Sequence, residues 1–400
     1  MKILKIIILL LNILLFINTI HFGLFAILPF LKKEKKQVKK EKKKNKFLIL
    51  IAARNEEKVI GNLIDSLKTQ NYDKDLFKIC VIPNNTTDNT KQIALDKKCL
   101  VIEPNFKTKT KGEVLNFAFD YFKNDNTFDS YVIFDADNIV DENFLKVMNN
   151  KINEGYRVIQ GFRDTKNLYE NSISGSYAIF FYTQNLFLYT PRERIGESST
   201  INGTGYIVLK SYIDQFNYKA STSTEDIELT CISHIKNEKI GFAKDAIFYD
   251  EQVSRFNTSM KQRKRWIQGS MQVFKKYYKE LFKNIKEKRN FDAIDMFQIL
   301  FLPINQAYAF ILLLLSYIFI IPFKYVLLSI IISYIDEFIF SIFVLKFYKK
   351  DVKRLLPAIL YFPIYHLSWI PIYIYSLFNS NNTWEEIKHT STLKIEEITK

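Results

Sequence analysis

The sequence is short of the residues that build disulfide frameworks and zinc sites. It has three cysteines, Cys80, Cys99 and Cys231, which are scattered and odd in number. Such cysteines fit a reducing compartment better than a set of disulfides. The four histidines lie far apart, and none has the spacing of zinc ligands. A metal bound by this chain would therefore be held by oxygen atoms.

Two common kinds of nucleotide-binding sequence are also missing. The chain has no GxGxxG and no GxxxxGK[ST], so binding of a dinucleotide or ATP in the usual loops is not supported. It also has no nucleic-acid-binding motif. Its net charge is nevertheless +15, and residues 32–46 hold ten lysines and two glutamates. Because this run follows an apolar segment, we expect it to face anionic lipid rather than nucleic acid.

Long apolar segments are abundant. Four segments carry few or no charges, at residues 6–30, 296–323, 325–345 and 355–378. A helix needs about 20 residues to cross the hydrocarbon core of a bilayer, so we expect four membrane-spanning helices. The first segment does not fit a cleaved signal peptide, because it is too long and its positive charge follows it.

Basic segments predict the orientation in the membrane. Residues 32–46 and 346–354 are rich in lysine and arginine, as are loops that stay in the cytoplasm. Four crossings place both segments on one side and both termini outside. We therefore expect a multi-pass plasma-membrane protein with a cytoplasmic catalytic domain. Asp336 and Glu337 lie within the third segment and mark either a polar path or a helix that does not span.

The region between the apolar segments is expected to be an α/β domain. Apolar runs at 47–52, 77–82, 130–134 and 157–162 alternate with helix-like stretches at 57–69, 88–97, 111–123 and 141–153. This order predicts a parallel sheet with helices on both faces. The expected division is a transmembrane helix in 1–31, a basic linker in 32–46, the catalytic domain with a final interfacial helix in 47–290, three transmembrane helices in 291–380, and a polar tail in 381–400.

Two aspartates follow the expected strand at 130–134. Asp135 and Asp137 are two residues apart, and such residues share one side of a strand. Ligands bind outside the carboxyl ends of strands in parallel sheets. Paired carboxylates can hold Mg²⁺ or Mn²⁺, which bridges a diphosphate and neutralises a leaving group. The alternative is a solvated turn, but the motifs that follow favour a metal site.

A second acidic pair, Glu225 and Asp226, follows the Ser/Thr-rich residues 221–224. We expect a helix to begin here, with Thr224 as its cap and the acids at its positive end. Capping alone would account for these residues. The chemical interpretation makes Asp226 the general base that takes a proton from an acceptor hydroxyl.

Residues 261–266 combine basic, amide and aromatic side chains. On a helix, Gln262 would share a face with Arg265 and Trp266. Arginine can bind phosphate through two hydrogen bonds, and tryptophan offers a flat surface to a sugar ring. The alternative is a basic helix anchored at the membrane surface by its tryptophan.

Two shorter motifs suggest close approach of a phosphate or sugar. Lys111 and Gly112 open an expected helix, which places a cation and backbone N–H groups near a phosphate. Gly203-Thr204-Gly205 would allow a ligand to approach the backbone closely. Each signal is weak when taken alone.

Taken in order, these motifs resemble inverting glycosyltransferase family 2, in the membrane-embedded branch that includes cellulose, hyaluronan and poly-N-acetylglucosamine synthases. The resemblance covers residues 47–272 and rests on residues 52–57, 84–90, Lys111-Gly112, Asp135-Ala136-Asp137, Gly203-Thr204-Gly205, Thr224-Glu225-Asp226 and residues 262–266. It implies a GT-A fold, a UDP-sugar donor, Mg²⁺ or Mn²⁺ as cofactor, and a single displacement with inversion.

The resemblance also implies roles for individual residues. Donor binding falls to Ala52, Arg54, Glu56, Asn84, Lys111, Asp135 and Asp137, of which Asp135 and Asp137 also hold the metal. Asp226 is the base, and the acceptor and diphosphate are bordered by Gly203, Thr204, Gly205, Glu225, Gln262, Arg265 and Trp266. The chain departs from the family at Asn84, where an aspartate usually contacts uracil, and at Ala52, where proline is common.

Three functions remain open at this point. The first is extension of a cell-surface or extracellular polysaccharide from a UDP-sugar of the glucose or N-acetylglucosamine type, with export or accessory subunits as partners. The second is transfer of one sugar to a lipid acceptor, because four crossings are few for a translocation channel. The third is a non-catalytic subunit that binds a nucleotide sugar, which the intact Asp226 and Arg265 argue against.

Overall fold

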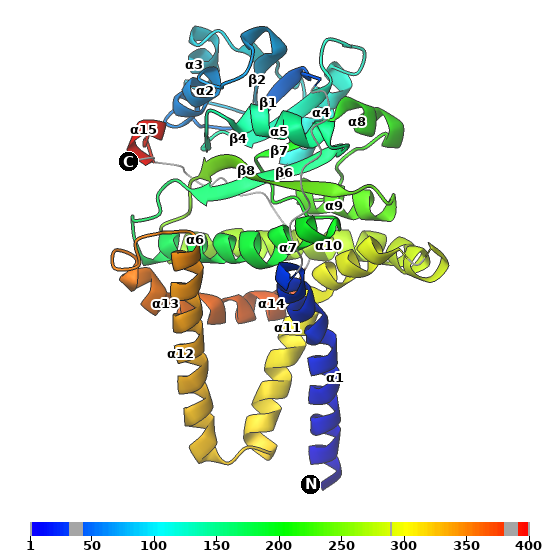
Figure 1. Cartoon of the computed structure of the whole chain (residues 1–400), viewed down its shortest axis with the longest axis vertical. Helices are drawn as coiled ribbons and strands as arrows, with labels where there is room; N and C mark the ends of the chain where they lie inside the picture. The colour runs from blue at the N-terminus through cyan, green and yellow to red at the C-terminus, as the bar shows by residue number, and fades with distance from the viewer. Residues whose placement is uncertain (1, 32–42, 289, 380–390, 399–400) are drawn as a thin grey trace.

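A β-sheet, a layer of helices and a set of projecting helices make up the protein (Figure 1). The structure is a computed structural model that describes residues 2–31, 43–288, 290–379 and 391–398. The expected basic linker at 32–46 and the start of the expected polar tail at 381–400 lie mostly outside these residues. The helices beneath the sheet run across the molecule, whereas α1, α11 and α12 point away from the sheet.

The sheet has eight strands in the order β3-β2-β1-β4-β7-β6-β8-β5. Their bounds are β1 Phe47–Ala53, β2 Phe77–Pro83, β3 Leu100–Val101, β4 Ser130–Asp135, β5 Ile139–Val140, β6 Val158–Thr165, β7 Tyr206–Leu209 and β8 Ile240–Asp250. The first four strands in this order are parallel. β7 is antiparallel to both of its neighbours, and β5 is antiparallel to β8.

The expectation of a wholly parallel sheet is therefore wrong, although the α/β class is confirmed. After β6 the chain leaves the sheet and passes through α6 and α7, which lie beneath it (Figure 1). It then returns in the opposite direction as β7. A strand of four residues has too few side chains to reveal its direction in the sequence.

Both faces of the sheet are buried, as expected for helices on two sides. Along β1, Phe47, Ile49 and Ile51 pack into the cluster that includes α2 and α5. Leu48 and Leu50, which point the other way, pack into the cluster that includes α4 and α8. This alternation follows from the two-residue period of a strand, and burial on both faces explains the continuous apolar run.

The helices surround the sheet and extend below it. Their bounds are α1 Lys2–Ile27, α2 Ile60–Lys68, α3 Thr90–Asp96, α4 Lys111–Tyr121, α5 Phe144–Asn153, α6 Ser172–Gln184, α7 Thr190–Ile195, α8 Lys210–Phe216, α9 Glu225–Ile235, α10 Phe256–Lys288, α11 Phe291–Phe319, α12 Phe323–Phe347, α13 Leu356–Leu367, α14 Trp369–Phe378 and α15 Ile395–Ile398. Short helical turns are η1 Leu28–Leu31, η2 Lys74–Leu76 and the π-helical η3 Asn185–Tyr189.

Two helices, α11 and α12, are long and apolar enough to cross a membrane. They correspond to the second and third expected crossings. The first expected crossing falls in α1, which lies beside α11, and Asn12 Nδ2 donates a hydrogen bond to Ser316 Oγ of α11 at 3.1 Å. That α1 spans a bilayer stays a prediction.

The fourth expected crossing is wrong as a single helix. Residues 355–378 form α13 and α14, which meet at Ser368 and run across the direction of α11 and α12 (Figure 1). Pro371 is the third residue of α14, and a proline inside a helix clashes with the carbonyl group four residues earlier, here that of Leu367. The proline is therefore tolerated only because a new helix begins at Trp369.

The loss of the fourth crossing changes the position of the C-terminal segment. Asn62 Nδ2 donates to the carbonyl oxygen of Thr392 at 2.9 Å, and Lys166 Nζ donates to that of Ser391 at 2.5 Å. This segment therefore lies against the α/β domain, and the expectation that both termini lie on the opposite side is wrong for the C-terminal one. The other end of the described chain lies at the far end of α1 (Figure 1).

The acidic pair in α12 lies beside α13. Glu337 Oε1 is 2.6 Å from His366 Nδ1 of α13, and Asp336 is exposed. Glu337 therefore has a partner on the helix that replaces the expected fourth crossing. Neither of the two expected roles of this pair is tested by this contact.

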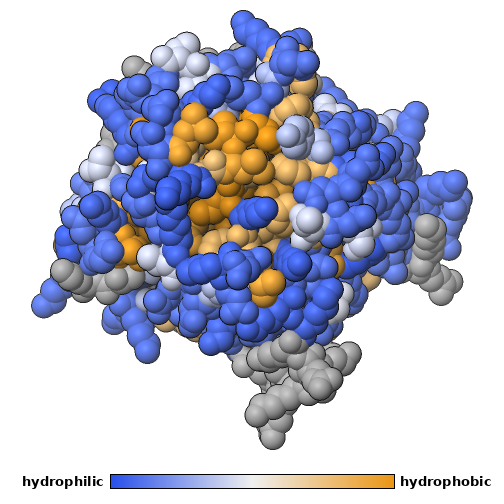
Figure 2. Space-filling model, turned by 90° about the horizontal axis from the view of Figure 1, so that it is seen from above, coloured by the Kyte–Doolittle hydropathy of each residue, from blue (hydrophilic) through white to orange (hydrophobic). Residues whose placement is uncertain are grey.

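The surface differs between the two ends of the molecule. Seen from the end that carries the sheet, it is mostly hydrophilic, with apolar side chains gathered in a central hollow (Figure 2). At the other end, large apolar side chains such as Ile3 and Phe323 are 75% and 87% exposed. Solvent therefore suits the sheet end, and lipid suits the projecting helices.

A buried ion pair joins the α/β domain to α11. Arg192 of α7 donates two hydrogen bonds of 2.7 Å to the carboxylate of Asp295, and both side chains are almost fully buried. We expect Arg192→Met to lower the free energy of unfolding by about 3–5 kcal/mol, because the Asp295 charge stays buried without its arginine. Thermal unfolding in detergent would measure this loss.

The exposed pair of Lys219 and Asp120 is a matched control for this prediction. Lys219→Met should cost at most about 1 kcal/mol, because exposed ion pairs contribute little. Equal losses in the two variants would contradict the assignment of the buried pair as the anchor of α11.

Candidate active site

One cavity of about 430 Å³ lies at the ends of β1, β2 and β4 and continues to α9, α10, α11 and α14. It is lined by all of the predicted site residues except Thr204 and Gly205. These lining residues are Ala52, Arg54, Glu56, Asn84, Lys111, Asp135, Asp137, Gly203, Glu225, Asp226, Gln262, Arg265 and Trp266. The carboxylates of Asp135 and Asp137 thus share one site with that of Asp226, which is about 90 residues away in the sequence.

Thr204 and Gly205 lie behind the cavity and support its wall. Thr204 Oγ1 accepts a hydrogen bond of 2.9 Å from the backbone N–H of Asp135. Gly205 has a φ of +62°, and a Cβ at this position would lie 2.1 Å from the ring of Phe248. The motif therefore fixes the end of β4 rather than contacting the cavity, apart from Gly203.

The donor end of the cavity is built around Arg54 and Asn84. The Arg54 guanidinium donates to the Asn84 side-chain oxygen at 2.8 Å and to the Asn84 carbonyl oxygen at 3.1 Å. The hydroxyl of Thr108 also donates to the same side-chain oxygen. Because an amide oxygen has two lone pairs, it has no capacity left for the N–H of a uracil base.

We expect Asn84→Asp to tighten UDP binding by about tenfold. A carboxylate keeps one oxygen for Arg54 and offers the other to the base N–H, and hydrogen bonds to charged groups are stronger by roughly 1–1.5 kcal/mol. Calorimetric titration with UDP would measure the change. Asn85→Asp adds the same charge at the next residue and should not tighten binding; unchanged affinity in Asn84→Asp would contradict the prediction.

Asp135 and Asp137 provide oxygen ligands at the end of β4. Asp137 is buried, whereas the Asp135 side chain is 40% exposed, and both line the cavity. In the described part of the chain no group of three His, Cys, Asp or Glu residues is arranged to hold a metal. Two carboxylates nevertheless fit Mg²⁺ or Mn²⁺, because such ions complete their coordination with substrate phosphates and water.

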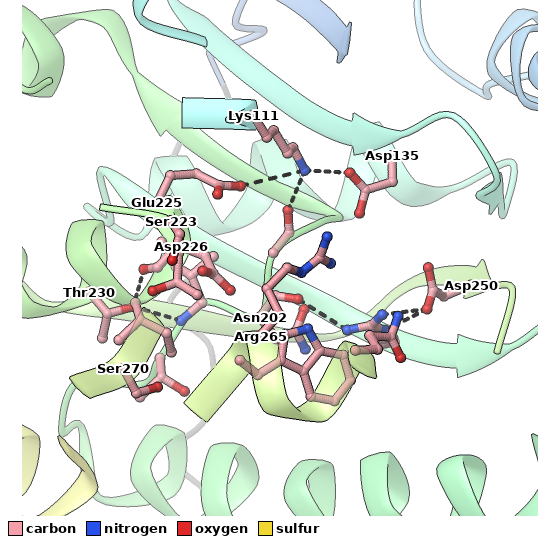
Figure 3. Close-up of a pocket in the computed structure, with 18 of the residues that line it drawn as sticks. Lys111, Asp135, Asn202, Ser223, Glu225, Asp226, Thr230, Asp250, Arg265 and Ser270 are labelled. Atoms are coloured by element: carbon pink, nitrogen blue, oxygen red, sulfur yellow. Dashed lines mark hydrogen bonds and ion pairs between the residues drawn. The ribbon is translucent and has the colours of Figure 1, made fainter. Parts of the chain in front are cut away.

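Lys111 joins the two acidic clusters (Figure 3). It opens α4, and its Nζ donates to Asp135 Oδ1 and, at 2.7 Å, to the Gly203 carbonyl oxygen, while it lies 3.7 Å from Glu225. Burial lowers the pKa of Lys111, but Asp135 and Glu225 outweigh it and raise the pKa overall. The ammonium group is therefore charged and suited to a diphosphate.

The predicted base lies at the first turn of α9. Asp226 Oδ2 would be 3.4 Å from a Cβ on Gly203, so this glycine leaves room beside the carboxylate. Burial raises the pKa of Asp226 above its ordinary value, and burial raises that of Glu225 to about 7. A raised pKa makes a carboxylate a better proton acceptor near neutral pH.

This arrangement predicts a pH dependence for catalysis. The base acts when deprotonated, so a raised pKa moves the loss of activity on acidification to higher pH. We expect kcat/KM to fall as pH drops through a pKa that burial raises above the usual value of aspartate. Glu225→Gln removes a neighbouring carboxylate and should shift this acid limb to lower pH. A pH profile of kcat/KM for both proteins measures the shift, and an identical limb would count against the assignment.

The loop that carries the base is held by α10, not by the expected cap. Thr224 makes no capping hydrogen bond, and its Cγ2 lies where only a glycine, Gly269 of α10, leaves space. Glu228 instead accepts hydrogen bonds from the backbone of Ser221 and Thr222 at 2.7 and 2.8 Å. The capping prediction for Thr224 is therefore wrong, and its side-chain oxygen is buried with no hydrogen-bond partner among the described residues.

Further contacts extend along α10. Gln272 Oε1 accepts from the backbone and hydroxyl of Ser223 at 3.1 and 2.9 Å. Lys276 Nζ and the hydroxyl of Tyr277 donate to Glu228 Oε1 at 2.9 and 2.8 Å. Residues 221–228 are thus held by one face of this 33-residue helix.

The late motif lies on the cavity side of α10. Gln262, Arg265 and Trp266 line the cavity, as the expected helical spacing requires. The Trp266 ring contacts Tyr177, Phe181 and Trp369, with centroids about 6 Å apart. Gln262 Oε1 is buried and has no hydrogen-bond partner among the residues that the structure describes.

Sequence analysis missed an ion pair beside the aspartates. Arg163 Nε donates to Asp250 Oδ2 at 3.0 Å, and Asn138 Nδ2 donates to Asp250 Oδ1 at 2.7 Å. Burial raises the pKa of Asp250 to about 6, although Arg163 opposes the shift. Asp250 and Glu251 end the apolar strand β8 just as Asp135 ends β4, which is the signal that could have identified them.

A second missed part of the site is its apolar end. α11 contributes Met296, Ile299, Leu302 and Pro303, and α14 contributes Trp369 and Tyr373. Gln184, Leu188 and Tyr189, at the π-helical η3, also line the cavity. π-helical turns occur mostly at functional sites. The cavity therefore continues from the carboxylates to the helices of the membrane region.

Comparison with known proteins shows the family and the fold. Residues 45–269 match the family described as "Glycosyltransferase like family 2". The mannosyltransferase PcManGT from Pyrobaculum calidifontis, solved in complex with GDP-Man and Mn²⁺, superposes with a TM-score of 0.60 at 13% identity. The superposition covers 90% of this chain and 99% of that one, which shows a shared fold.

Curated relatives fall into the same class. The Bacillus subtilis protein named "Probable glycosyltransferase YdaM" is 26% identical over 86% of this chain and 83% of its own length. The β-monoglucosyldiacylglycerol synthase of Synechocystis is 25% identical over 58% of this chain, and the poly-β-1,6-N-acetyl-D-glucosamine synthase of Staphylococcus aureus is 23% identical over 60%. The matches span 49% and 57% of those two enzymes. The match to the family covers residues 45–269, which is more than half of the chain. The chain therefore belongs to glycosyltransferase family 2.

Proposed function

We propose that this glycosyltransferase transfers a sugar of the glucose or N-acetylglucosamine type from a UDP-sugar to an acceptor hydroxyl, with inversion. The proposal is carried by one observation. Asp135, Asp137 and Asp226 line the same cavity, so the predicted diphosphate ligands and the predicted base can act on one substrate pair.

The proposed mechanism is a single displacement. The Asp226 carboxylate accepts the proton of the acceptor hydroxyl as the hydroxyl oxygen forms a bond to the anomeric carbon. The bond between that carbon and the diphosphate oxygen breaks on the opposite face, and UDP leaves with its electron pair. Lys111 and Arg265 stabilise the negative charge that develops on the diphosphate.

A divalent cation completes this site in the proposal. Mg²⁺ or Mn²⁺ held by Asp135 and Asp137 would neutralise charge on the diphosphate. Arg54 and Asn84 hold the nucleotide end, and Trp266 offers its ring to a sugar. Gly203 has no side chain that would crowd Asp226, since a Cβ there would lie 3.4 Å from Asp226 Oδ2.

The apolar helices indicate where the protein lies in the cell. α11 and α12 are long and apolar enough to cross a membrane, and the basic residues 346–354 follow α12 on the side of the α/β domain. We infer a membrane protein of the plasma membrane whose catalytic domain is cytoplasmic, where UDP-sugars are made and thiols stay reduced.

Different observations favour two kinds of acceptor. Extension of a polysaccharide is favoured by the match to the poly-β-1,6-N-acetyl-D-glucosamine synthase, whose product is a polymer. Transfer to a lipid is favoured by the match to the glucosyldiacylglycerol synthase and by the apolar end of the cavity.

The test is incubation of the purified chain in vesicles with a panel of UDP-sugars and GDP-mannose, with UDP or GDP release measured. Release that requires a UDP-sugar supports the proposal. Release from GDP-mannose alone, or from none of the donors, would overturn it. Product size then separates a ladder of long chains from a lipid that carries a single sugar.

A further inference from the structure

We propose that the acceptor is an uncharged membrane lipid with a free hydroxyl group, and that it enters the cavity between α11 and α14. This inference rests on the proposed function, because it names the acceptor that Asp226 deprotonates. The cavity runs without interruption from Asp226 to Ile299 and Leu302 of α11 and to Trp369 and Tyr373 of α14.

The charges along the cavity differ between its two ends. The cationic residues that line it are Arg54, Lys109, Lys111, Arg163 and Arg265. Lys111 contacts Asp135, and Arg163 contacts Asp250, so both belong to the donor end. α11 and α14, which are described throughout, contribute only apolar and aromatic residues to the lining.

This distribution disfavours a lipid phosphate as the acceptor. A phosphate that reached the anomeric carbon would be repelled by the carboxylates of Glu225 and Asp226. On its way out of the hydrocarbon it would also find no cationic side chain of α11 or α14 in the cavity lining to pair with. A phosphate is also ionised already and needs no base. A neutral hydroxyl has the opposite requirements, because it needs a carboxylate to take its proton.

A buried polar atom lies at the junction of the two ends. Gln262 lines the cavity, and its Oε1 is buried with no hydrogen-bond partner in the described part of the chain. This amide oxygen can accept a hydrogen bond from an O–H group. A hydroxyl of the lipid headgroup therefore satisfies Gln262 while the acyl chains remain among the side chains of α11 and α14.

A growing polymer fits the described membrane helices less well. In α12, only 6% of the most apolar 18-residue stretch is buried within the chain. A helix that lines an enclosed channel is buried on at least one face by its neighbours. Within the described residues most side chains of α12 are exposed instead, so this helix does not line an enclosed channel.

The experiment uses the full chain in phosphatidylcholine vesicles that contain diacylglycerol, a polyprenyl phosphate or neither. Radiolabelled UDP-glucose and UDP-N-acetylglucosamine are the donors, and label in the extracted lipid is measured. Leu302→Trp fills the apolar end and should lower transfer to diacylglycerol by about tenfold or more. Ile304→Trp is the matched control, because Ile304 is a half-buried residue of the same helix outside the cavity lining.

Label in diacylglycerol, lost in Leu302→Trp and kept in Ile304→Trp, supports the inference. UDP binding, measured by calorimetry, shows that the donor site of each variant is folded. If the chain binds UDP but labels only polyprenyl phosphate or a long polymer, the inference is overturned while the proposed function stands. Equal labelling by both variants also overturns it. A chain that binds no UDP and releases none contradicts the proposed function itself.

Discussion

Replacing Asp226 by asparagine should lower turnover by about 10³-fold, within the usual contribution of a general base. The amide has nearly the same shape as the carboxylate but cannot accept the acceptor's proton. Donor binding should be unchanged, because the nucleotide end of the cavity lies at Arg54 and Asn84. UDP release measures the first effect, and calorimetric UDP binding measures the second.

Asp245→Asn is the control for this variant. Asp245 is exposed on β8 and does not line the cavity, so its replacement should leave turnover unaltered. If Asp226→Asn retains turnover near that of the unaltered chain, Asp226 is not the base. Loss of UDP binding together with turnover would instead indicate a structural role for the carboxylate.

The second large effect is expected at the aspartate pair. Asp137→Asn should lower turnover by about 10²–10³-fold, because a bound cation contributes several kcal/mol of charge stabilisation. Chelation of divalent ions should reduce the unaltered chain to the same level, and added Mn²⁺ or Mg²⁺ should restore it. The variant should respond weakly to either treatment. Turnover measured across a titration of the metal gives both comparisons.

Full activity of the unaltered chain in excess chelator would remove Asp135 and Asp137 from the proposed metal site. The Asp135 carboxylate would then serve the structure through Lys111, and that of Asp137 through Asn138 Nδ2, which donates to it at 3.3 Å. Asp141→Asn, six residues beyond the end of β4 and outside the cavity lining, provides a control for the loss of one negative charge near this strand.

Local patterns predicted the parallel half of the sheet well. The run at 47–52 matches β1 because a strand that is buried on both faces needs an apolar side chain at each position. Asp135 marks the end of β4 because a carboxylate cannot continue into the core. The family resemblance, which rests on these patterns, is confirmed by the match over residues 45–269.

The remaining features depend on contacts between distant parts of the chain. The direction of β7 follows from the passage of the chain beneath the sheet, and the pairing of Arg163 with Asp250 joins strands β6 and β8. No spacing along the sequence encodes either one. A proline such as Pro371 can break a helix, but helices in membranes tolerate proline. The presence of Pro371 in the sequence therefore does not distinguish one continuous span from two helices.

The apolar end of the cavity was hidden for a related reason. Ile299, Leu302 and Pro303 look the same in sequence as side chains that face lipid. Only the position of α14 across α11 shows that some of them line the site. The residues proposed to contact the acceptor therefore resemble membrane anchors, whereas those proposed to bind the donor lie in recognisable polar motifs.

The contacts between α10 and residues 221–228 couple the position of this helix to that of Asp226. This helix is one continuous rod that reaches from Gln262 in the cavity to a lysine-rich end suited to a lipid surface. Gly269 of α10 packs closely against Thr224, since a Cβ at Gly269 would lie 2.2 Å from Thr224 Cγ2. A tilt of α10 would therefore move the neighbouring Asp226. In the proposed function, where α10 lies at a membrane surface, the thickness and charge of the leaflet would therefore affect the position of Asp226 relative to the donor and acceptor.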